Sequence, residues 1–264
     1  MEYAIVTSKK DEAGCNVRKR LLELFPFKKE ATQHSLGNIS LYEIEIDSIY
    51  AENIDKQIDA DALIFATKHQ SRAGTKSLSV HVPGNFWKAE MGGRDKTLCI
   101  APASLLKAMF VELDKNGKEL GGYEITLETV HHGPCLEKPV MFIEIGSSAN
   151  EWNIKEAGEI IAKTIMNVLQ NPIKECKAVI AIGGPHYPRE YNKFLLRTEY
   201  AIGQICPEYQ LPNLDEAMLN QMLKRNVEKI EFVLLDWKGL KGHKEIVKGL
   251  LEKINIPYKK IQEF

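Results

Sequence analysis

Short apolar runs alternate with longer segments of helical period along the chain. The runs that we expect to form strands are Tyr3–Val6, Ile39–Ile46, Asp61–Thr67, Leu78–His81, Tyr123–Val130, Val140–Ile145, Ala178–Ile182, Tyr200–Cys206, Ile230–Leu235 and a short one near Ile256. Apolar and polar residues alternate in Ile39–Ile46, as in a half-buried strand. Asp61–Thr67 is apolar almost throughout, as in a fully buried strand.

The segments between these runs have the period of amphipathic helices. They are the stretch Leu21–Phe25, the segments Ala103–Asp114 and Asn153–Leu169, and two stretches that begin near Asn213–Asp215 and at Lys244. Pro26 closes the first helix. Ser104 is a possible cap of the second helix, and Gly117 lies just beyond its end. In the third, Asn153 is the expected N-cap and Glu156 takes the capping-box position.

Strands that alternate with helices predict an α/β fold with a mixed, largely parallel sheet and helices on both faces. We describe the sheet as mixed because the two strands within residues 123–145 could form an antiparallel hairpin. The sequence shows no internal repeat, low-complexity tract or linker. We therefore expect a single domain that spans residues 1–264, a length that one α/β unit often reaches.

The composition is that of an ordinary globular protein, with 44% hydrophobic and 27% charged residues. A net charge of −1 excludes a uniformly basic coat for nucleic acid, but not a local patch. One basic cluster near the N-terminus consists of Lys9, Lys10, Arg18, Lys19, Arg20, Lys28 and Lys29. Residues 223–264 hold ten Lys or Arg against six Asp or Glu. Each cluster is either a solvated helix face or a contact for phosphates.

Cysteine usage and the absence of long apolar stretches indicate the compartment. The five cysteines at 15, 99, 135, 176 and 206 form no C-x-x-C pair, and the first residues, MEYAIVTSKK, lack a signal-peptide pattern. No apolar stretch approaches the roughly 20 residues of a membrane span. We expect a cytoplasmic protein with reduced thiols and without contact with a membrane. The sequence shows no sign of an obligate protein partner, which is compatible with a monomer.

Histidines carry the strongest functional signal. Five of the seven lie at or just after the ends of expected strands: His69, His81, His131, His132 and His186. In open α/β sheets, ligands bind in the crevice outside the carboxyl ends of the strands. One such histidine would more often be a structural residue, but five predict a functional cluster at this edge.

The chemistry of this cluster stays open between two classes. Glu128 and Glu144, on strands expected to be adjacent, could join the histidines in holding zinc, which makes hydroxide available at neutral pH. Alternatively, a histidine acts without metal as a general base or oxyanion donor. His131 and His132 can both reach one site only if the strand before them has ended.

Other catalytic devices are not favoured by the sequence. It contains no G-x-S-x-G elbow and no H-E-x-x-H helix, so covalent catalysis by Ser71, Thr129, Ser147 or Cys135 is not expected. Glycines flank the histidines, but none forms a G-x-G-x-x-G or P-loop motif, which argues against a nucleotide cofactor.

Several short motifs occur in one order. They are H-V-P-G-N at 81–85, M-G-G at 91–93, A-P-A at 101–103, H-H-G-P at 131–134, F-I-E-I-G-S-S at 142–148 with Trp152, G-G-P-H-Y at 183–187 and K-G-L-K-G-H-K-E at 238–245. Together they resemble the archaeal and plant type of D-aminoacyl-tRNA deacylase. The resemblance implies a zinc-dependent hydrolase that cleaves the ester between a D-amino acid and the terminal ribose of tRNA. It also implies a fold related to peptidyl-tRNA hydrolase and purine nucleoside phosphorylase.

The resemblance also implies the site residues. Catalytic roles fall to His81, His131, His132 and His186, and zinc ligands would be His131, His132 and His186. Substrate-binding roles fall to His69, Gly84, Asn85, Gly133, Glu144, Gly184, Lys238 and Lys241. The partner would be the tRNA acceptor end that carries a D-amino acid. Val130 and Gln204 stand where the family pattern leads us to expect threonine and histidine, so no site role is carried over to them.

The mechanism expected from this reading is direct attack of water on the ester carbonyl. Selection against the abundant L-ester would come from rigid backbone in HVPGN or GGPHY, so substitution of Gly84 or Gly184 should harm selectivity or activity. Two alternatives are a nucleoside phosphorylase-like transferase, whose turnover would require phosphate, and a non-catalytic tRNA-binding protein.

Overall fold

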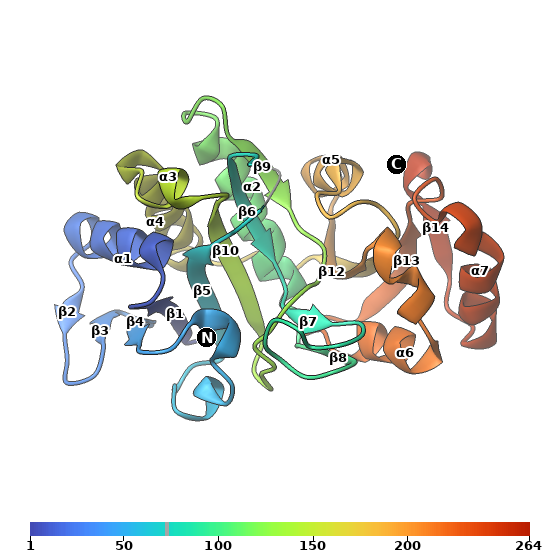
Figure 1. Cartoon of the computed structure of the whole chain (residues 1–264), viewed down its shortest axis with the longest axis horizontal. Helices are drawn as coiled ribbons and strands as arrows, with labels where there is room; N and C mark the ends of the chain where they lie inside the picture. Colours follow the sequence, from blue (N-terminus) through green and yellow to red (C-terminus); the bar gives the residue numbers. More distant parts are fainter. Residues whose placement is uncertain (72–73) are drawn as a thin grey trace.

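The computed structural model describes residues 1–71 and 74–264, and its strands form two main sheets. The eight-stranded sheet has the order β2 (Lys28–Lys29), β3 (His34–Leu36), β4 (Ile39–Ile44), β1 (Tyr3–Ser8), β5 (Ala62–Lys68), β10 (Val140–Gly146), β6 (Ser77–His81) and β9 (Glu124–Leu127). The four-stranded sheet has the order β12 (Tyr200–Cys206), β11 (Lys177–Ile182), β13 (Ile230–Leu235) and β14 (Tyr258–Lys260). Two short strands, β7 (Gly84–Asn85) and β8 (Thr97–Leu98), pair with each other. Figure 1 shows the four-stranded sheet on the right, beside the larger one.

Strand directions confirm the prediction of a mixed, largely parallel α/β fold. Strands β4, β1, β5 and β10 run parallel to one another, and all pairs of the four-stranded sheet are parallel. Strand β6 runs antiparallel to β10, and β9 runs parallel to β6. The antiparallel direction therefore enters the centre of the sheet through β6.

The hairpin expected within residues 123–145 is wrong, because β6 lies between β9 and β10. The chain after β9 turns instead to the second sheet. The N–H of Thr129 donates to the carbonyl of His186 at 3.2 Å, and the N–H of Val130 donates to the carbonyl of Ile205 at 3.1 Å. This segment therefore joins the two sheets, which a local hairpin would not do.

Seven helices accompany the sheets in the described residues. They are α1 (Glu12–Leu24), α2 (Ala103–Gly117), α3 (Ala149–Trp152), α4 (Lys155–Leu169), α5 (Arg189–Arg197), α6 (Glu216–Lys224) and α7 (Lys244–Lys253). Helices α1, α4 and α2 contact one another in this order and pack against β5, β10 and β6 respectively; Figure 1 shows α2 behind β6. None of these helices combines the length and the apolar character that crossing a membrane requires.

Two expected caps are wrong. Ser148 caps the short helix α3 in a capping box with Glu151, and α4 begins only after Asn153. The side chain of Asn153 donates instead to the carboxylate of Glu12. At the start of α2, the carboxylate of Glu228 accepts the N–H groups of residues 103 and 104 at 3.0 and 2.7 Å. The capping box of Ser148 and Glu151 is a local pattern, whereas Glu12 and Glu228 are distant in sequence from the residues that they contact.

One face of the large sheet is polar where β5, β10, β6 and β9 meet. Glu144 on β10 lies opposite Thr67 on β5 and Ser79 on β6, and Phe142 lies opposite His81. Directly paired residues point to the same face, and residues two apart on a strand do so as well. A stripe of buried polar side chains therefore crosses the centre of the sheet on the face that holds the histidines.

The buried apolar residues of both sheets belong to one continuous core. The single-domain organisation that the sequence suggested stays a prediction.

Candidate active site

The structure brings all five strand-end histidines into one cluster. The ring centre of His131 lies 4.2 Å from that of His81, 4.4 Å from that of His132 and 4.6 Å from that of His186. The ring of His69 lies 6.0 Å from that of His186. Five residues that are spread over more than a hundred positions of sequence thus form a single group.

From the sequence we expected the cluster at the carboxyl edge of the sheet, and this expectation is wrong. His69 follows the end of β5, but His81 ends β6, which runs in the opposite direction to β10. The two histidines meet because both point from the polar face toward Glu144. His131 and His132 follow β9 after the strand has ended, as the sequence reading required, and His132 has a left-handed φ of 46°. His186 comes from the loop after β11.

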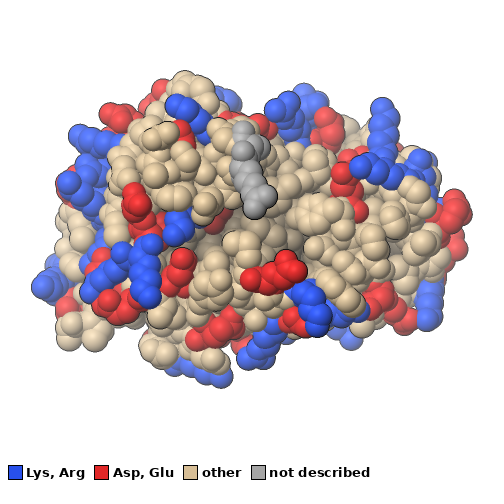
Figure 2. All heavy atoms as spheres, viewed as in Figure 1, with Lys and Arg blue, Asp and Glu red and all other residues tan. Residues whose placement is uncertain are grey.

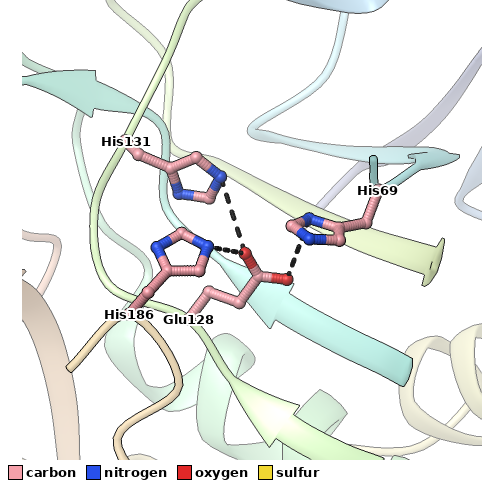
Figure 3. Close-up of side chains that lie close together, drawn as sticks. All are labelled: His69, Glu128, His131 and His186. Atoms are coloured by element: carbon pink, nitrogen blue, oxygen red, sulfur yellow. Dashed lines mark ion pairs between the residues drawn. The ribbon is translucent and has the colours of Figure 1, made fainter. Parts of the chain in front are cut away.

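Glu128 lies at the centre of the cluster. Its Oε2 is 2.8 Å from Nε2 of His186 and 3.5 Å from Nε2 of His131, and its Oε1 is 3.4 Å from Nδ1 of His69. Figure 3 shows the three imidazoles arranged around this carboxylate. Glu128 is only 1% exposed, and neither of its oxygens has a hydrogen bond of regular geometry to a described residue.

A second buried carboxylate, Glu144, supports the cluster from β10. Its Oε1 accepts a hydrogen bond from Oγ1 of Thr67 at 2.8 Å. Its Oε2 lies 3.4 Å from Nδ1 of His69 and 3.6 Å from Nε2 of His81. Because β6 separates β9 from β10, Glu128 and Glu144 are not on adjacent strands as expected; they face each other across His81 and His69.

The two carboxylates and the histidines shift one another's acidity. Burial alone would raise the pKa of Glu128, but His186 and the charges of His69 and His131 lower it to about 2. Burial also opposes ionisation of Glu144, yet His81 and His69 hold its pKa well below the usual value. Both groups are therefore ionised at neutral pH in the metal-free protein.

The histidines divide into two kinds. Burial would lower the pKa of His69, but the hydrogen bond and charge of Glu144, together with Glu128, raise it to about 9. The pKa of His81 is likewise raised by Glu144 against the effect of burial. Burial and neighbouring histidines hold the pKa of His131 well below its usual value, and burial and His81 lower that of His132 to about 4. His131 and His132 are therefore neutral.

Backbone carbonyls fix the tautomers of the two neutral rings. Nδ1 of His131 lies 2.8 Å from the carbonyl of Thr129, and Nδ1 of His132 lies 2.6 Å from the carbonyl of Gly133. A carbonyl only accepts, so each Nδ1 carries the proton. Nε2 of each ring then presents a lone pair to the interior of the cluster, which suits a metal ligand or a base.

Two groups of these residues have the donor set of a metal site. One consists of His69, Glu128, His131 and His186, and the other of His81, His131 and His132. The trio predicted from sequence, His131, His132 and His186, is divided between them. Zinc bonds of about 2.0–2.1 Å place tetrahedral ligand atoms roughly 3.3 Å apart. Nε2 of His131 lies 3.5 Å from Oε2 of Glu128 and Nδ1 of His69 lies 3.4 Å from Oε1, both close to this value, while Nε2 of His186 lies nearer, 2.8 Å from Oε2; the carboxylate has no competing hydrogen bond among the described residues.

A cavity of about 350 Å³ opens onto the cluster. His69, His131, His132, His186 and Glu144 line it, with Thr67, Lys68, Gln70, Asp11, Asp47 and Ser48 as further polar residues. Ile49 and Met91 are the two apolar residues of the lining. This volume lies within the range of small-ligand sites.

Several residues implied by the resemblance lie outside this lining. A Cβ on Gly84 would meet Leu98 and Val130 at 3.0 Å, so this glycine permits close packing of the interior. The side chain of Asn85 donates to the carbonyl of Gly92 at 2.9 Å. Gly84 itself lies outside the lining, but its N–H donates to the carbonyl of the lining residue His132 at 2.8 Å, and its expected role in excluding the L-ester stays a prediction.

Gly133, Gly184, Lys238 and Lys241 also lie outside the lining. Gly133 packs against Gly93, and Lys241 pairs with Glu208, whose N–H donates to the carbonyl of Gly184. These lysines are exposed beside the GGPHY loop, and their role in binding tRNA stays a prediction.

Gln204, one departure from the family pattern, is buried and lies apart from the cluster. Its side-chain N–H groups donate to the carbonyls of Cys99 and Arg225 at 2.8 and 2.9 Å. These two hydrogen bonds connect strand β12 to the neighbouring loops.

Sequence reasoning missed two tyrosines and undervalued Glu128. The hydroxyl of Tyr187 lies 2.7 Å from Nε2 of His69, and that of Tyr209 lies 3.5 Å from Nδ1 of His186. Glu128 was suggested only as a companion of Glu144. The sequence did contain a usable signal. Thr126 and Glu128 alternate with apolar residues, so both point to the same face of the strand, and a carboxylate at such a position is a candidate for the site.

Comparison with known proteins gives a consistent result. Residues 56–259 match a family model described as D-aminoacyl-tRNA deacylase. Proteins named D-aminoacyl-tRNA deacylase from Thermococcus kodakarensis and Pyrococcus furiosus are 32% and 34% identical over 269 and 268 residues, covering 96% of this chain and 98% of each relative. The protein of that name from Methanococcus vannielii is 32% identical over 273 residues, covering 99% of this chain and all of the relative.

A crystal structure described as a conserved protein of unknown function is similar in fold. It superposes with a TM-score of 0.91 at 27% identity and covers 99% of this chain and 96% of its own.

Proposed function

We propose that the chain, which belongs to the D-aminoacyl-tRNA deacylase family, cleaves its substrate at the cluster around Glu128. The protein is a hydrolase of the ester bond of D-aminoacyl-tRNA. One observation carries the assignment of the site: three histidines face the two oxygens of a single fully buried carboxylate beside a cavity of about 350 Å³. A purely structural core would not retain a carboxylate without regular hydrogen bonds, because its burial costs free energy.

Zinc is the metal that this donor set suits best. Three of the four residues His69, Glu128, His131 and His186 would hold it through histidine nitrogens or the carboxylate and would leave one position open, as in zinc hydrolases. Bound there, zinc would polarise the ester carbonyl and lower the pKa of water to roughly 7.

Glu144, Thr67 and Tyr187 position the ligands. Thr67 fixes Glu144 by a hydrogen bond of 2.8 Å, and Glu144 in turn faces His69 and His81. The hydroxyl of Tyr187 contacts the remaining nitrogen of His69 at 2.7 Å. Such outer contacts set ring orientation and tautomer, which metal ligands depend on.

His132 is the general base of this proposal. Its Nδ1 proton is held by the carbonyl of Gly133, so Nε2 has a lone pair, and the residue lines the cavity. Nε2 takes the proton of the attacking water as the new bond forms to the ester carbonyl carbon. When the bond from that carbon to the ribose oxygen breaks, Nε2 returns the proton to the ribose oxygen. The products are a free D-amino acid and tRNA.

Release of labelled tyrosine from matched D- and L-tyrosyl-tRNA tests this function. Wild type should release D-tyrosine and leave the L-ester intact, and His132→Asn should lose about 100-fold or more of the rate as the base is removed. His34→Asn is the matched control, because His34 lies on β3 away from the cluster and should keep full activity.

Three results would contradict the proposal. An unimpaired His132→Asn would remove the base from the mechanism. Turnover strictly dependent on phosphate would favour a transferase of the nucleoside phosphorylase type. Tight tRNA binding without ester cleavage would favour a non-catalytic tRNA-binding protein.

A further inference from the structure

The apolar part of the cavity lining continues outward onto an exposed surface. Met91 lines the cavity yet is 57% exposed, and Tyr50, next to the lining residue Ile49, is 54% exposed. Tyr50 and Met91 come from different loops but lie beside each other, because a Cβ on Gly92 would meet the Tyr50 ring at 3.3 Å. We call Tyr50 and Met91 together the rim platform.

The rim platform is held by the backbone of the active-site loop. The N–H of Gly133 donates to the carbonyl of Met91 at 2.9 Å, and Asn85 donates to the carbonyl of Gly92 at 2.9 Å. The N–H of Gly93 donates to Glu52 at 2.9 Å. Gly92 lies so close to the carbonyl of Ile49 that no side chain fits between them. The backbone segments that carry the two exposed side chains are thus held against the loop of His132.

We propose that the rim platform stacks the 3′-terminal adenine of tRNA. The inference rests on the proposed function. The scissile ester is carried by the ribose of the terminal nucleotide, so its base must lie one ribose away from the cluster, at the mouth of the cavity. Unpaired bases stack on aromatic rings, and methionine packs well against such flat surfaces.

The position of the platform favours the adenine over the amino-acid side chain as its occupant. The side chain of the amino acid is bonded next to the reacting carbonyl and stays inside the cavity. The apolar surface instead leads away from the cluster, from Ile49 over Met91 to Tyr50. Arg94, which follows the Met91–Gly93 segment, is exposed and forms no salt bridge among the described residues, so its charge is available to a nucleotide phosphate.

The surrounding surface agrees with this occupant. On the face drawn in Figure 2, the central part consists largely of residues other than Lys, Arg, Asp and Glu, and charged residues gather around it. Single-stranded nucleic acid suits such a surface, because bases stack in the centre while phosphates meet the Lys and Arg side chains at the margin, where Asp and Glu are also present.

The test compares binding of uncharged tRNA that ends in CCA with the same tRNA lacking the terminal adenosine. Wild type should bind the complete tRNA about five- to a hundredfold more tightly, the range that stacking of one base gives. The double variant Met91→Ala with Tyr50→Ala should lose this preference. Val111→Ala, which truncates an exposed side chain on α2, should keep it.

Two outcomes would overturn the inference: absence of the preference in wild type, or its persistence in the double variant. Hydrolysis of D-tyrosyl-tRNA and D-aspartyl-tRNA adds a second readout, since the loss of a platform for adenine in the double variant raises KM for both esters equally. A defect confined to the tyrosyl ester would assign the platform to the amino-acid side chain instead. Failure of the proposed function shows separately, as wild type that binds tRNA but releases no D-amino acid.

Discussion

The two sheets of the molecule use their buried positions differently. Around β10, the large sheet buries Ser77, Ser79 and His81 together with Glu128 and Glu144, and several of their polar atoms have no hydrogen-bond partner among the described residues. The four-stranded sheet buries apolar residues on both faces of its central strands, as in Ala178–Ile182 of β11 and Phe232–Leu235 of β13.

This contrast separates the parts of the fold that stabilise it from those that carry its chemistry. Each unpaired buried polar group costs about 1–3 kcal/mol, and only a function explains why one sheet contains so many. The second sheet contributes one histidine, His186, to the cluster, and Tyr187 and Tyr209 from its loops contact the histidines. It delivers His186 through Gly183 and Gly184, whose φ angles of 98° and 86° suit glycine.

Glu128→Gln is the strongest test of the polar region. We expect hydrolysis of D-tyrosyl-tRNA to fall at least about 1,000-fold, because the amide weakens the group that three histidines share, whereas loss of an outer contact alone costs 10–100-fold. Glu45→Gln, at an exposed ion pair with Lys9, should retain full activity. Thermal unfolding of both variants checks that the fold persists; a fully active Glu128→Gln would refute the central role of this residue.

Leu234→Ala is the corresponding test of the apolar sheet. Leu234 is fully buried in β13, and its truncation should lower the free energy of unfolding by about 2–5 kcal/mol. Urea unfolding measures this loss, and kcat of the folded variant should remain within about threefold of wild type, since β13 supplies no side chain to the cluster. A large drop in kcat without loss of stability would contradict the division between the sheets.

Tyr187→Phe tests a contact that joins the second sheet's loop to the cluster. Removing the hydroxyl from Nε2 of His69 should reduce both kcat and zinc affinity by about 10–100-fold, with KM little changed. Tyr258→Phe, on β14, is the control. Unchanged zinc affinity would show that Tyr187 does not position a metal ligand.

The smallest expected effect is a change in the free energy of unfolding caused by Asp11→Asn. This variant tests a buried carboxylate whose two oxygens each accept a backbone hydrogen bond. Asp11 accepts the N–H groups of Gly14 and Lys68, and burial raises its pKa to about 6 from 3.8. Between about pH 4 and 6 the folded protein keeps a proton that the unfolded chain has lost, so this group's contribution to stability falls as pH rises. The stability of wild type relative to Asp11→Asn should decline by about 1–2 kcal/mol from pH 4 to pH 7.

Urea unfolding of both proteins at the two pH values measures that difference, and all other titrations cancel between them. A difference that stays constant, or that grows in favour of wild type, would contradict the assignment.

The sequence predicted most of the elements that local pattern determines, but it missed helix α5. The strands and the α/β class follow from apolar periodicity, and the histidine cluster follows from positions at strand ends. Strand order does not, because β6 pairs with β9 and β10 through backbone groups that carry no sequence signal. For the same reason the cluster was expected at an edge but lies over the face of the sheet.

The individual site contacts depend on this non-local pairing. Glu128 lies at the centre because its N–H continues the ladder with Val80 beyond the end of β9. Met91 and Tyr50 are brought together by the close packing of Gly92 against Ile49, which neither loop shows alone. Gly84 permits close packing against Leu98 and Val130, and its expected role in selecting against the L-ester stays a prediction.

Release of tyrosine from D- and L-tyrosyl-tRNA by chelator-treated protein, before and after addition of zinc, tests the central claim most directly. We predict that treated wild type loses D-specific release and that zinc restores it, whereas treated Glu128→Gln is not restored. D-specific release that is indifferent to both chelation and zinc would contradict a metal site at Glu128 and would assign catalysis to the histidines alone.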